Sequence, residues 1–257
     1  MTDTIPNLHA VDTSQCFPLY LYEKPKPDEG LFAGTATSEE YTKSDGISDE
    51  GLKHFQTAYS KAEITKEQLF YYVYGLLYSP EYRERFQNNL SKELPRIPAV
   101  KRYEDFRALS DAGRKLGDLH VNYEKVAPYP VTFKQGDLRL AEIKDPTSFF
   151  RVQKMKYAGV RGKTDSTTVI YNHNITMTNI PLEAYEYVVN GKSALDWVME
   201  RQSVKTDKES GIVNDANDYA NETMNNPAYP LELFQRVITV SLETMKVVKG
   251  LPKLEID

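Results

Sequence analysis

Two groups of residues in this sequence have the types and spacing that nucleic-acid chemistry uses. Asp137, followed by Glu142 and Lys144, follows the acid and Glu-x-Lys pattern of metal-dependent nucleases. In those enzymes carboxylates hold Mg²⁺ and the lysine supports the attacking water. The spacing here is very short, and Glu142 and Lys144 would share one face of any strand. We therefore favour a solvated hairpin over a nuclease centre.

A second group is the run Asn-Pro-Ala-Tyr at residues 226–229. It is close to the Asn-Pro-Pro-aromatic loop with which adenine methyltransferases grip the amino group and stack the flipped base. The second proline is missing, and no Gly-x-Gly strand end could hold a methyl donor. A helix stop before the last helix explains Pro227 and Pro230 more simply.

Other catalytic signatures are absent from the sequence. The four histidines, at positions 9, 54, 120 and 173, are not at metal-ligand spacing. No Gly-x-x-x-x-Gly-Lys-Ser/Thr loop for ATP is present. The single cysteine, Cys16, rules out an internal disulfide and a cysteine-based zinc site within one chain, and fits a reducing cytoplasm. We therefore expect no catalytic residues, no metal and no cofactor in this chain.

The charge of the chain is unevenly distributed. The 257 residues carry a net charge of −5, which argues against a uniformly basic nucleic-acid surface. Residues 151–164, however, hold five basic side chains and no acid, whereas acids gather in residues 28–50 and 207–222. No stretch of 18 apolar residues and no secretory signal pattern is present, so we expect a cytoplasmic protein without a membrane span.

The hydrophobic periodicity predicts an α+β fold with a helical N-terminal half, a β-rich insertion near residues 128–180 and a closing helical segment. We expect an irregular tether over 1–47, a helical coupling region over 48–127, and a β-rich plus helical recognition region over 128–257. Helices are predicted to begin at Ser48 and Thr65 and to cover 81–93, 103–121, 193–202, 214–223 and 230–248. Strands are predicted over 149–157, 167–171 and 175–177, with a hairpin joining 131–133 to 138–140.

Several stretches together resemble one family. The run Phe-Tyr-Tyr-Val-Tyr-Gly-Leu-Leu at residues 70–77 precedes Ser-Pro-Glu-Tyr-Arg at 79–83 and Leu-Pro-Arg-Ile-Pro at 94–98. The most specific block, at 187–201, contains Asn-Gly-Lys-Ser, the only tryptophan and Glu-Arg; Gly-Ile-Val-Asn-Asp at 211–215 and the final helix around 241–244 follow it. These stretches resemble the C-terminal target-recognition (specificity) domain of type ISP restriction-modification enzymes.

The resemblance implies a function and its partners. In that bacterial family one polypeptide joins a nuclease, an ATP-driven helicase-type translocase, an N6-adenine methyltransferase and, last, the recognition domain. The chain would then be a non-catalytic domain that recognises a specific sequence in duplex DNA. Its partners would be the DNA and the methyltransferase and helicase domains of the same polypeptide. ATP, Mg²⁺ and S-adenosylmethionine would bind only to those other domains.

The resemblance also directs attention to residues 151–174. Reading a base in the major groove needs Arg or Lys for guanine and Asn or Gln for adenine, while other contacts to phosphates set the register. The segment has that mixture, and the glycines around Arg161 permit a tight basic turn. The predicted DNA-binding residues are Arg151, Gln153, Lys154, Lys156, Tyr157, Arg161, Lys163, Tyr171, Asn172 and Asn174. The alternative is a structural adaptor that docks the methyltransferase or motor and makes little direct DNA contact.

Overall fold

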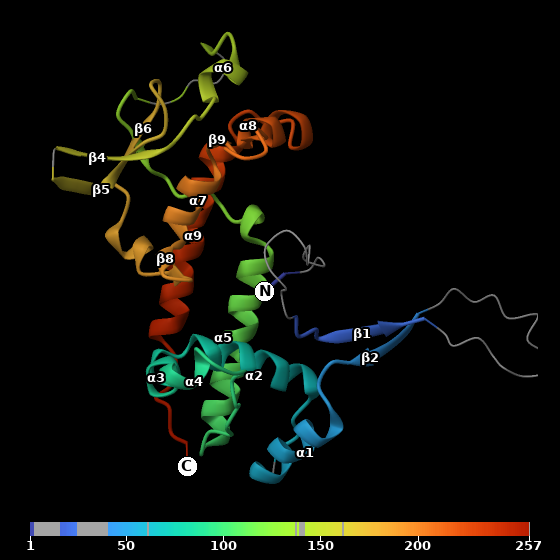
Figure 1. The fold of residues 1–257 in the computed structure, drawn as a ribbon. Helices are drawn as coiled ribbons and strands as arrows, with labels where there is room; N and C mark the ends of the chain where they lie inside the picture. Colours follow the sequence, from blue (N-terminus) through green and yellow to red (C-terminus); the bar gives the residue numbers. More distant parts are fainter. Residues whose placement is uncertain are drawn as a thin grey trace, which may run out of the picture. The chain divides into compact units, whose positions relative to one another are not determined.

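The chain folds into two compact units that both contain helices and small sheets. The computed structural model describes residues 1–2, 16–24, 41–60, 62–136, 138, 142–160 and 162–256 (Figure 1). Unit 1 comprises Met1–Asp118 and Gly250–Asp257, and unit 2 comprises Leu119–Lys249. This mixture of helices with short strands confirms the predicted α+β class.

Unit 1 is mainly helical. Its elements are β1 (Tyr20–Glu23), β2 (Thr42–Asp45), α1 (Asp49–Ala58), α2 (Lys66–Tyr78), α3 (Pro80–Arg85), α4 (Gln87–Leu90) and α5 (Tyr103–Val121), whose last turn passes into unit 2. Strands β1 and β2 pair antiparallel, so part of the range predicted to be irregular has regular structure.

Side-chain caps begin the helices of unit 1 where the sequence predicts them. The Ser48 side chain accepts a hydrogen bond from the Gly51 N–H at the start of α1. Thr65 and Gln68 form a reciprocal capping box at the start of α2. Each cap satisfies backbone donors that the first helical turn leaves without a partner. The predicted starts of these two helices are therefore confirmed.

The core of unit 1 forms where α2 and α5 pack closely. Gly75 and Gly113 allow this packing, because a Cβ added at Gly113 would lie 1.9 Å from the Tyr71 carbonyl oxygen. Tyr72 and Phe106 stack at the centre of this core with ring centroids 4.7 Å apart.

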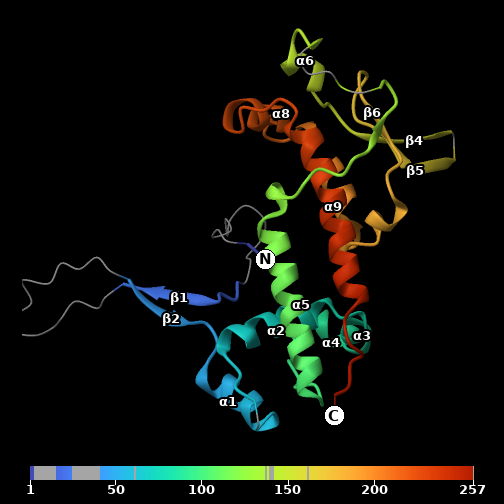
Figure 2. The same cartoon turned by 180° about the vertical axis from the view of Figure 1, so that it is seen from behind.

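Unit 2 contains a four-stranded antiparallel sheet, several short elements and one long helix. Its elements are η1 (Tyr123–Lys125), β3 (Thr132–Phe133), α6 (Pro146–Phe150), β4 (Lys156–Val160), β5 (Lys163–Ile170), β6 (Thr176–Thr178), η3 (Leu182–Tyr185), β7 (Val188–Val189), β8 (Lys192–Ser193), α7 (Ala194–Arg201), β9 (Val204–Thr206), β10 (Val213–Asp215), α8 (Ala216–Asp218), the π-helical turn η4 (Tyr219–Thr223) and α9 (Tyr229–Lys249). The sheet order is β3-β6-β5-β4. The β4–β5 hairpin extends away from α9 in both views (Figures 1 and 2).

Helix α9 supplies one side of the core of unit 2. Phe234 and Ile238 on this helix are fully buried, as are Val169 and Met177 on neighbouring strands of the sheet. The predicted helices over 103–121, 193–202 and 230–248 are confirmed as α5, α7 and α9. Within the described ranges, no helix combines the length and the apolar character needed to cross a membrane.

The strand predicted over 149–157 is wrong. Residues 146–150 form α6, and β4 begins only at Lys156. The local sequence favours a helix start, because the Asp145 carboxylate accepts the Ser148 N–H and Pro146 occupies the first turn. The apparent alternation over this range therefore reflects the burial of single residues in an irregular segment.

Two other predicted helices are rearranged, and one predicted hairpin lies mostly outside the described residues. Strand β3 pairs with β6, and of its predicted partner, residues 138–140, only Leu138 is described. The helix predicted over 81–93 is interrupted at Phe86, before the weak helix formers Asn88 and Asn89. The helix predicted over 214–223 is replaced by β10, the short α8 and η4, because asparagine side chains in this range hydrogen-bond to the backbone.

Candidate functional site

The segment that links α6 to β4 contains both buried apolar residues and exposed polar residues. Val152 is fully buried and Met155 is 2% exposed, whereas Gln153 and Lys154 between them are exposed. Since the two apolar side chains are held in the core of unit 2, the two polar ones face solvent.

The β4–β5 hairpin continues the exposed polar surface. Lys156 and Lys163 are exposed on its two strands, and Val160 at its tip is 78% exposed. Arg161 lies outside the described residues. Gly159 has φ +136°, and the register shifts between Tyr157 and Ala158. A bulge of this kind re-aims the side chains of the bulged strand.

The predicted residue Arg151 is exposed but is held by an ion pair. Its guanidinium donates to Asp215 Oδ2 at 2.5 Å. Burial acts to raise the pKa of the Asp215 carboxyl, but hydrogen bonds from Asn217 and Arg151 outweigh it, so this pKa lies below its ordinary value. The carboxylate is therefore ionised near neutral pH and keeps Arg151 in place.

Two predicted tyrosines use their hydroxyls inside unit 2. The Tyr171 side chain is fully buried and its hydroxyl donates to the Phe150 carbonyl at 2.6 Å. The Tyr157 hydroxyl donates to Asp196 Oδ1 at 2.6 Å. Burial first, and the Asp196 carboxylate second, raise the pKa of Tyr157 well above its ordinary value. These hydroxyls stay protonated and are occupied by internal acceptors.

Two predicted asparagines shape the turn after β5. The Asn172 side chain donates to the carbonyls of Phe149 and Arg151 and accepts the N–H groups of Asn174 and Ile175. The Asn174 side chain donates to the Phe149 carbonyl at 3.2 Å. Their amides therefore join the turn to the end of α6.

Among the described members of the predicted set, four side chains are thus exposed: Gln153 and Lys154 before β4, and Lys156 and Lys163 on the β4–β5 hairpin. No ion pair is found for these three lysines within the part of the chain that the structure describes. Arg151 precedes these residues in the chain.

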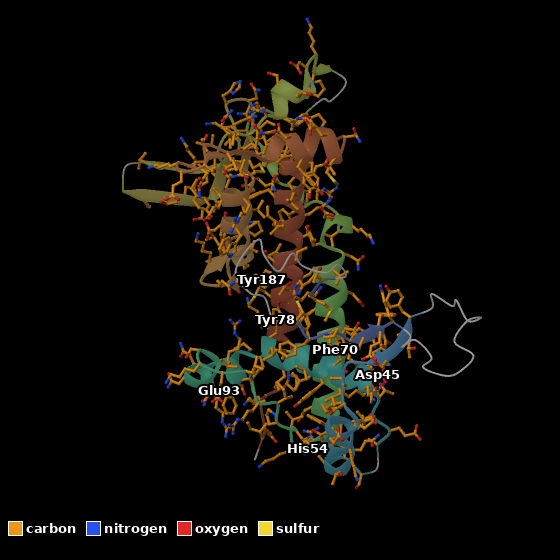
Figure 3. All side chains as sticks on the ribbon, turned by 45° about the vertical axis from the view of Figure 1, so that its right-hand side comes forward. Asp45, His54, Phe70, Tyr78, Glu93 and Tyr187 are labelled. Atoms are coloured by element: carbon orange, nitrogen blue, oxygen red, sulfur yellow. The ribbon has the colours of Figure 1, made fainter. Side chains whose placement is uncertain are left out.

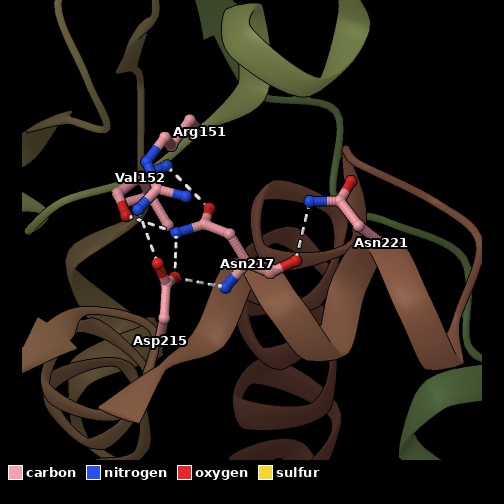
Figure 4. Close-up of polar contacts among 5 residues, drawn as sticks. All are labelled: Arg151, Val152, Asp215, Asn217 and Asn221. Atoms are coloured by element: carbon pink, nitrogen blue, oxygen red, sulfur yellow. Dashed lines mark hydrogen bonds and ion pairs between the residues drawn. The ribbon is translucent and has the colours of Figure 1, made fainter. Parts of the chain in front are cut away.

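The structure adds two residues that the sequence analysis missed. Asn217 is 2% exposed, and its side chain bonds to both backbone polar groups of Val152 (Figure 4). Asp215 binds Asn217 and Arg151 (Figure 4). Asp215 and Asn217 lie inside a predicted helix, although Asp and Asn side chains compete with the helix for backbone hydrogen bonds. Their presence there was the sequence signal that could have identified them.

The single tryptophan has a structural contact. Trp197 Nε1 donates to the Val189 carbonyl at 2.8 Å, and Lys192 and Arg201 lie over its ring. It therefore holds the β7–β8 turn against α7. Both elements lie in the block of residues 187–201 that carries the family resemblance.

The catalytic alternatives gain no support from the geometry. Tyr229 is 5% exposed and its hydroxyl donates to Glu124, while Asn226 accepts the Ala228 N–H where α9 begins. The aromatic ring is thus packed and cannot stack on a base from this position. Glu142 and Lys144 border an open surface hollow beside α6, and Asp137 lies outside the described residues.

The histidines lie on different elements. His54 is on α1 (Figure 3), His120 is in the last turn of α5, and His173 is in the turn between β5 and β6; His9 is outside the described residues. Over the ranges that the structure covers, no group of three His, Cys, Asp or Glu side chains could hold a metal ion.

Unit 2 is therefore an α+β domain with an exposed polar and basic segment. The buried Asn217 side chain holds the backbone of Val152, next to this segment. The sequence of residues 1–233 matches the family described as the type ISP C-terminal specificity domain. The chain belongs to this family, which confirms the resemblance seen in the sequence.

Solved structures of larger proteins contain the same fold. One is described as the ATP-dependent type ISP restriction-modification enzyme LlaBIII bound to DNA; it is 34% identical over 93% of this chain, with a TM-score of 0.73. A nuclease-deletion mutant of the type ISP enzyme LlaGI, in complex with a DNA substrate mimic, is 40% identical over 84% of the chain, with a TM-score of 0.64. A DrdV–DNA complex is 31% identical over 99% of the chain, with a TM-score of 0.73.

This chain spans only a small part of those proteins. It covers 14% of the LlaBIII chain, 14% of the LlaGI chain and 23% of the DrdV chain. A search of curated proteins finds no match.

Proposed function

We propose that this chain recognises a specific sequence in duplex DNA, and that unit 2 makes the contact. The observation that carries the proposal is the exposure of one glutamine and three lysines next to the buried Val152 and Met155. These exposed residues are Gln153, Lys154, Lys156 and Lys163. The specificity-domain family and the related proteins bound to DNA support it.

The geometry around these residues suits the major groove. That groove admits a two-stranded β-ribbon, and the β4–β5 hairpin is such a ribbon, projecting from the unit (Figure 1). A glutamine can bond to the adenine edge, and lysines can bond to guanine or to phosphates. We assign base reading to Gln153 and phosphate contacts to Lys156 and Lys163, with Arg161 retained as a predicted contact.

The other predicted residues take supporting parts in this proposal. Four of them form hydrogen bonds within unit 2 and so support the segment that carries the exposed residues. They are Tyr157, Tyr171, Asn172 and Asn174. Arg151 is shared between Asp215 and the DNA, because it is exposed yet ion-paired.

In this proposal the chain is non-catalytic by itself and works as part of a longer cytoplasmic polypeptide. The nuclease, translocase and methyltransferase activities belong to other domains, along with their ATP, Mg²⁺ and S-adenosylmethionine. The methyltransferase and helicase domains are then its partners, and the chain directs them to a target sequence.

Selection from a random duplex library, followed by fluorescence anisotropy on enriched sequences, tests this function. We expect the 257-residue chain to enrich a short motif. The double variant Lys156→Ala/Lys163→Ala should lose most of that binding, because each lysine supplies a phosphate contact. The double variant Lys53→Ala/Lys246→Ala makes the same change in net charge at exposed positions elsewhere and should bind as the wild type does.

The adaptor function remains the second candidate, because the chain carries a net charge of −5 and exposes apolar side chains such as Leu182 and Val188. No enriched motif, with weak binding that both double variants share, would rule out the recognition function and favour the adaptor.

A further inference from the structure

The Asn217 side chain pairs with the backbone N–H and carbonyl of Val152, as a neighbouring β-strand would. Its Oδ1 accepts the Val152 N–H at 2.9 Å, and its Nδ2 donates to the Val152 carbonyl at 2.9 Å (Figure 4). Asn217 and Val152 are both buried, so neither pair of groups has water as an alternative partner. A buried backbone group left unpaired would cost as much as a lost hydrogen bond, so this pairing is strongly held.

The orientation of the Asn217 amide is set by its other contacts. Asp215 Oδ1 accepts the Asn217 Nδ2–H at 2.6 Å and the Asn217 backbone N–H at 2.9 Å. A flipped amide would place its oxygen against two other oxygens, the Asp215 carboxylate and the Val152 carbonyl. Asp215 also accepts the Arg151 guanidinium, so two consecutive residues, Arg151 and Val152, are bound from the same three-residue stretch.

The next residue along the segment is held from another strand. The Gln153 carbonyl accepts the Val204 N–H of β9 at 2.9 Å, and β9 pairs with β10, which ends at Asp215. The backbones of Val152 and Gln153 are therefore both hydrogen-bonded, and Val152 and Met155 are buried in the core, so the backbone that carries the exposed Gln153 side chain is held in place.

Resting on the function proposed above, we propose that Asn217 is a positioning residue for sequence discrimination: it clamps residues 151–155 so that Gln153 meets a base edge in the major groove. Base reading by hydrogen bonds depends on the placement of the side chain, whereas attraction of lysines to phosphates tolerates movement. The clamp therefore governs the choice of sequence more than the total affinity.

The proposal predicts a specific pattern of losses. Asn217→Ala should lower the ratio of affinities for the enriched motif and for random duplex about tenfold, the equivalent of about 1.4 kcal/mol. The affinity for random duplex and the slope of log K against log salt concentration should stay close to those of the wild type, because no lysine is removed.

Asn221→Ala is the matched control. Asn221 lies on the same stretch of the chain, and its side chain donates to the Asn217 carbonyl at 2.8 Å without touching Val152 (Figure 4). It should reduce the melting temperature but keep the ratio of affinities. Equal loss of the ratio in both variants would show that the amide acts only through general stability, which would overturn the proposal.

Two milder variants decide the matter if Asn217→Ala does not fold. Asp215→Asn keeps a good helix cap but weakens the hold on Asn217 and Arg151, and Gln153→Ala changes an exposed side chain. We expect both to fold, with Gln153→Ala relaxing the preference at one base position of the selected motif. Unchanged motifs in both variants would overturn the clamp.

The outcomes separate this inference from the function on which it rests. If the wild-type chain enriches no motif, the recognition function fails and the clamp fails with it. If the wild type enriches a motif and Asn217→Ala reads it with the same ratio, recognition stands and only the clamp is overturned.

Discussion

At the scale of single residues, the imidazole of His120 combines burial with specific contacts. Its Nε2 atom lies 2.9 Å from Thr244 Oγ1, and its ring stacks on Tyr187 with centroids 5.6 Å apart. Burial lowers the pKa of His120 to about 4. The folded protein therefore keeps this imidazole neutral over a pH range in which an unfolded histidine takes up a proton.

This shift predicts a loss of stability in mild acid. Below the ordinary histidine pKa of about 6.5 the unfolded state binds a proton that the folded state cannot bind until about pH 4. The free energy of unfolding should thus fall as the pH drops from 6.5 towards 4, by about 2–3 kcal/mol from this group. Urea unfolding at pH 7.5 and pH 5, followed by Trp197 fluorescence in the same unit, measures it.

His120→Gln should flatten this pH dependence because it removes the titrating group. His173→Gln, at an exposed position in the same unit, is the control. A His120→Gln variant that keeps the pH dependence of the wild type would contradict the prediction.

At the scale of elements, the β4–β5 hairpin depends on one glycine. Gly159 pairs with Thr164 and has φ +136°, a conformation that side chains strongly disfavour. A Cβ at this position would lie 2.2 Å from the Lys163 carbonyl oxygen. The hairpin that carries Lys156 and Lys163 can keep its shape only if this residue is glycine.

Gly159→Ala should therefore distort the hairpin, destabilise unit 2 by about 1–3 kcal/mol and weaken binding of the selected DNA motif. Gly162→Ala is the matched change in the same turn; its φ is +85°, but a Cβ there meets nothing within 4 Å. We expect the larger fall in melting temperature and in affinity from Gly159→Ala. Equal effects from both variants would show that strain alone, not the close contact, matters.

At the scale of the whole molecule, the uneven distribution of charge explains how an acidic chain could bind DNA. The sequence holds 32 basic and 37 acidic residues, yet the candidate surface between Gln153 and Lys163 presents lysines without a described ion pair. Local contacts with phosphates release counterions whatever the net charge of the protein. The net charge of the protein instead acts on DNA over longer distances, and salt screens this long-range repulsion.

This arrangement predicts a moderate salt dependence. Two phosphate contacts, from Lys156 and Lys163, correspond to a slope of log K against log salt of about −1.8. Anisotropy titrations between about 50 mM and 200 mM salt measure this slope. Lys163→Ala should reduce the magnitude of the slope by about 1. Lys246→Ala, which changes the net charge equally, should leave it unchanged; a slope near zero in the wild type would contradict the phosphate contacts.

The sequence alone determined the elements that depend on local interactions. The capping box of Thr65 and Gln68, the long apolar stripe of α5 and the periodicity of α9 all predicted helices that the structure contains. These signals involve residues within a few positions of each other, so one sequence is enough to recognise them. The basic run from residue 151 to 164 likewise located the candidate surface.

Only the tertiary structure decided which side chains of that surface face solvent. Tyr171 and Asn172 have residue types that suit DNA, but they donate hydrogen bonds to the carbonyls of Phe150 and Phe149 at the end of α6, so these groups face the inside of the unit. Asn217 lies 65 residues from Val152 in the chain, so no local pattern relates the two. Burial and pairing of backbone groups arise from contacts between distant segments, and those contacts form only when the whole unit folds.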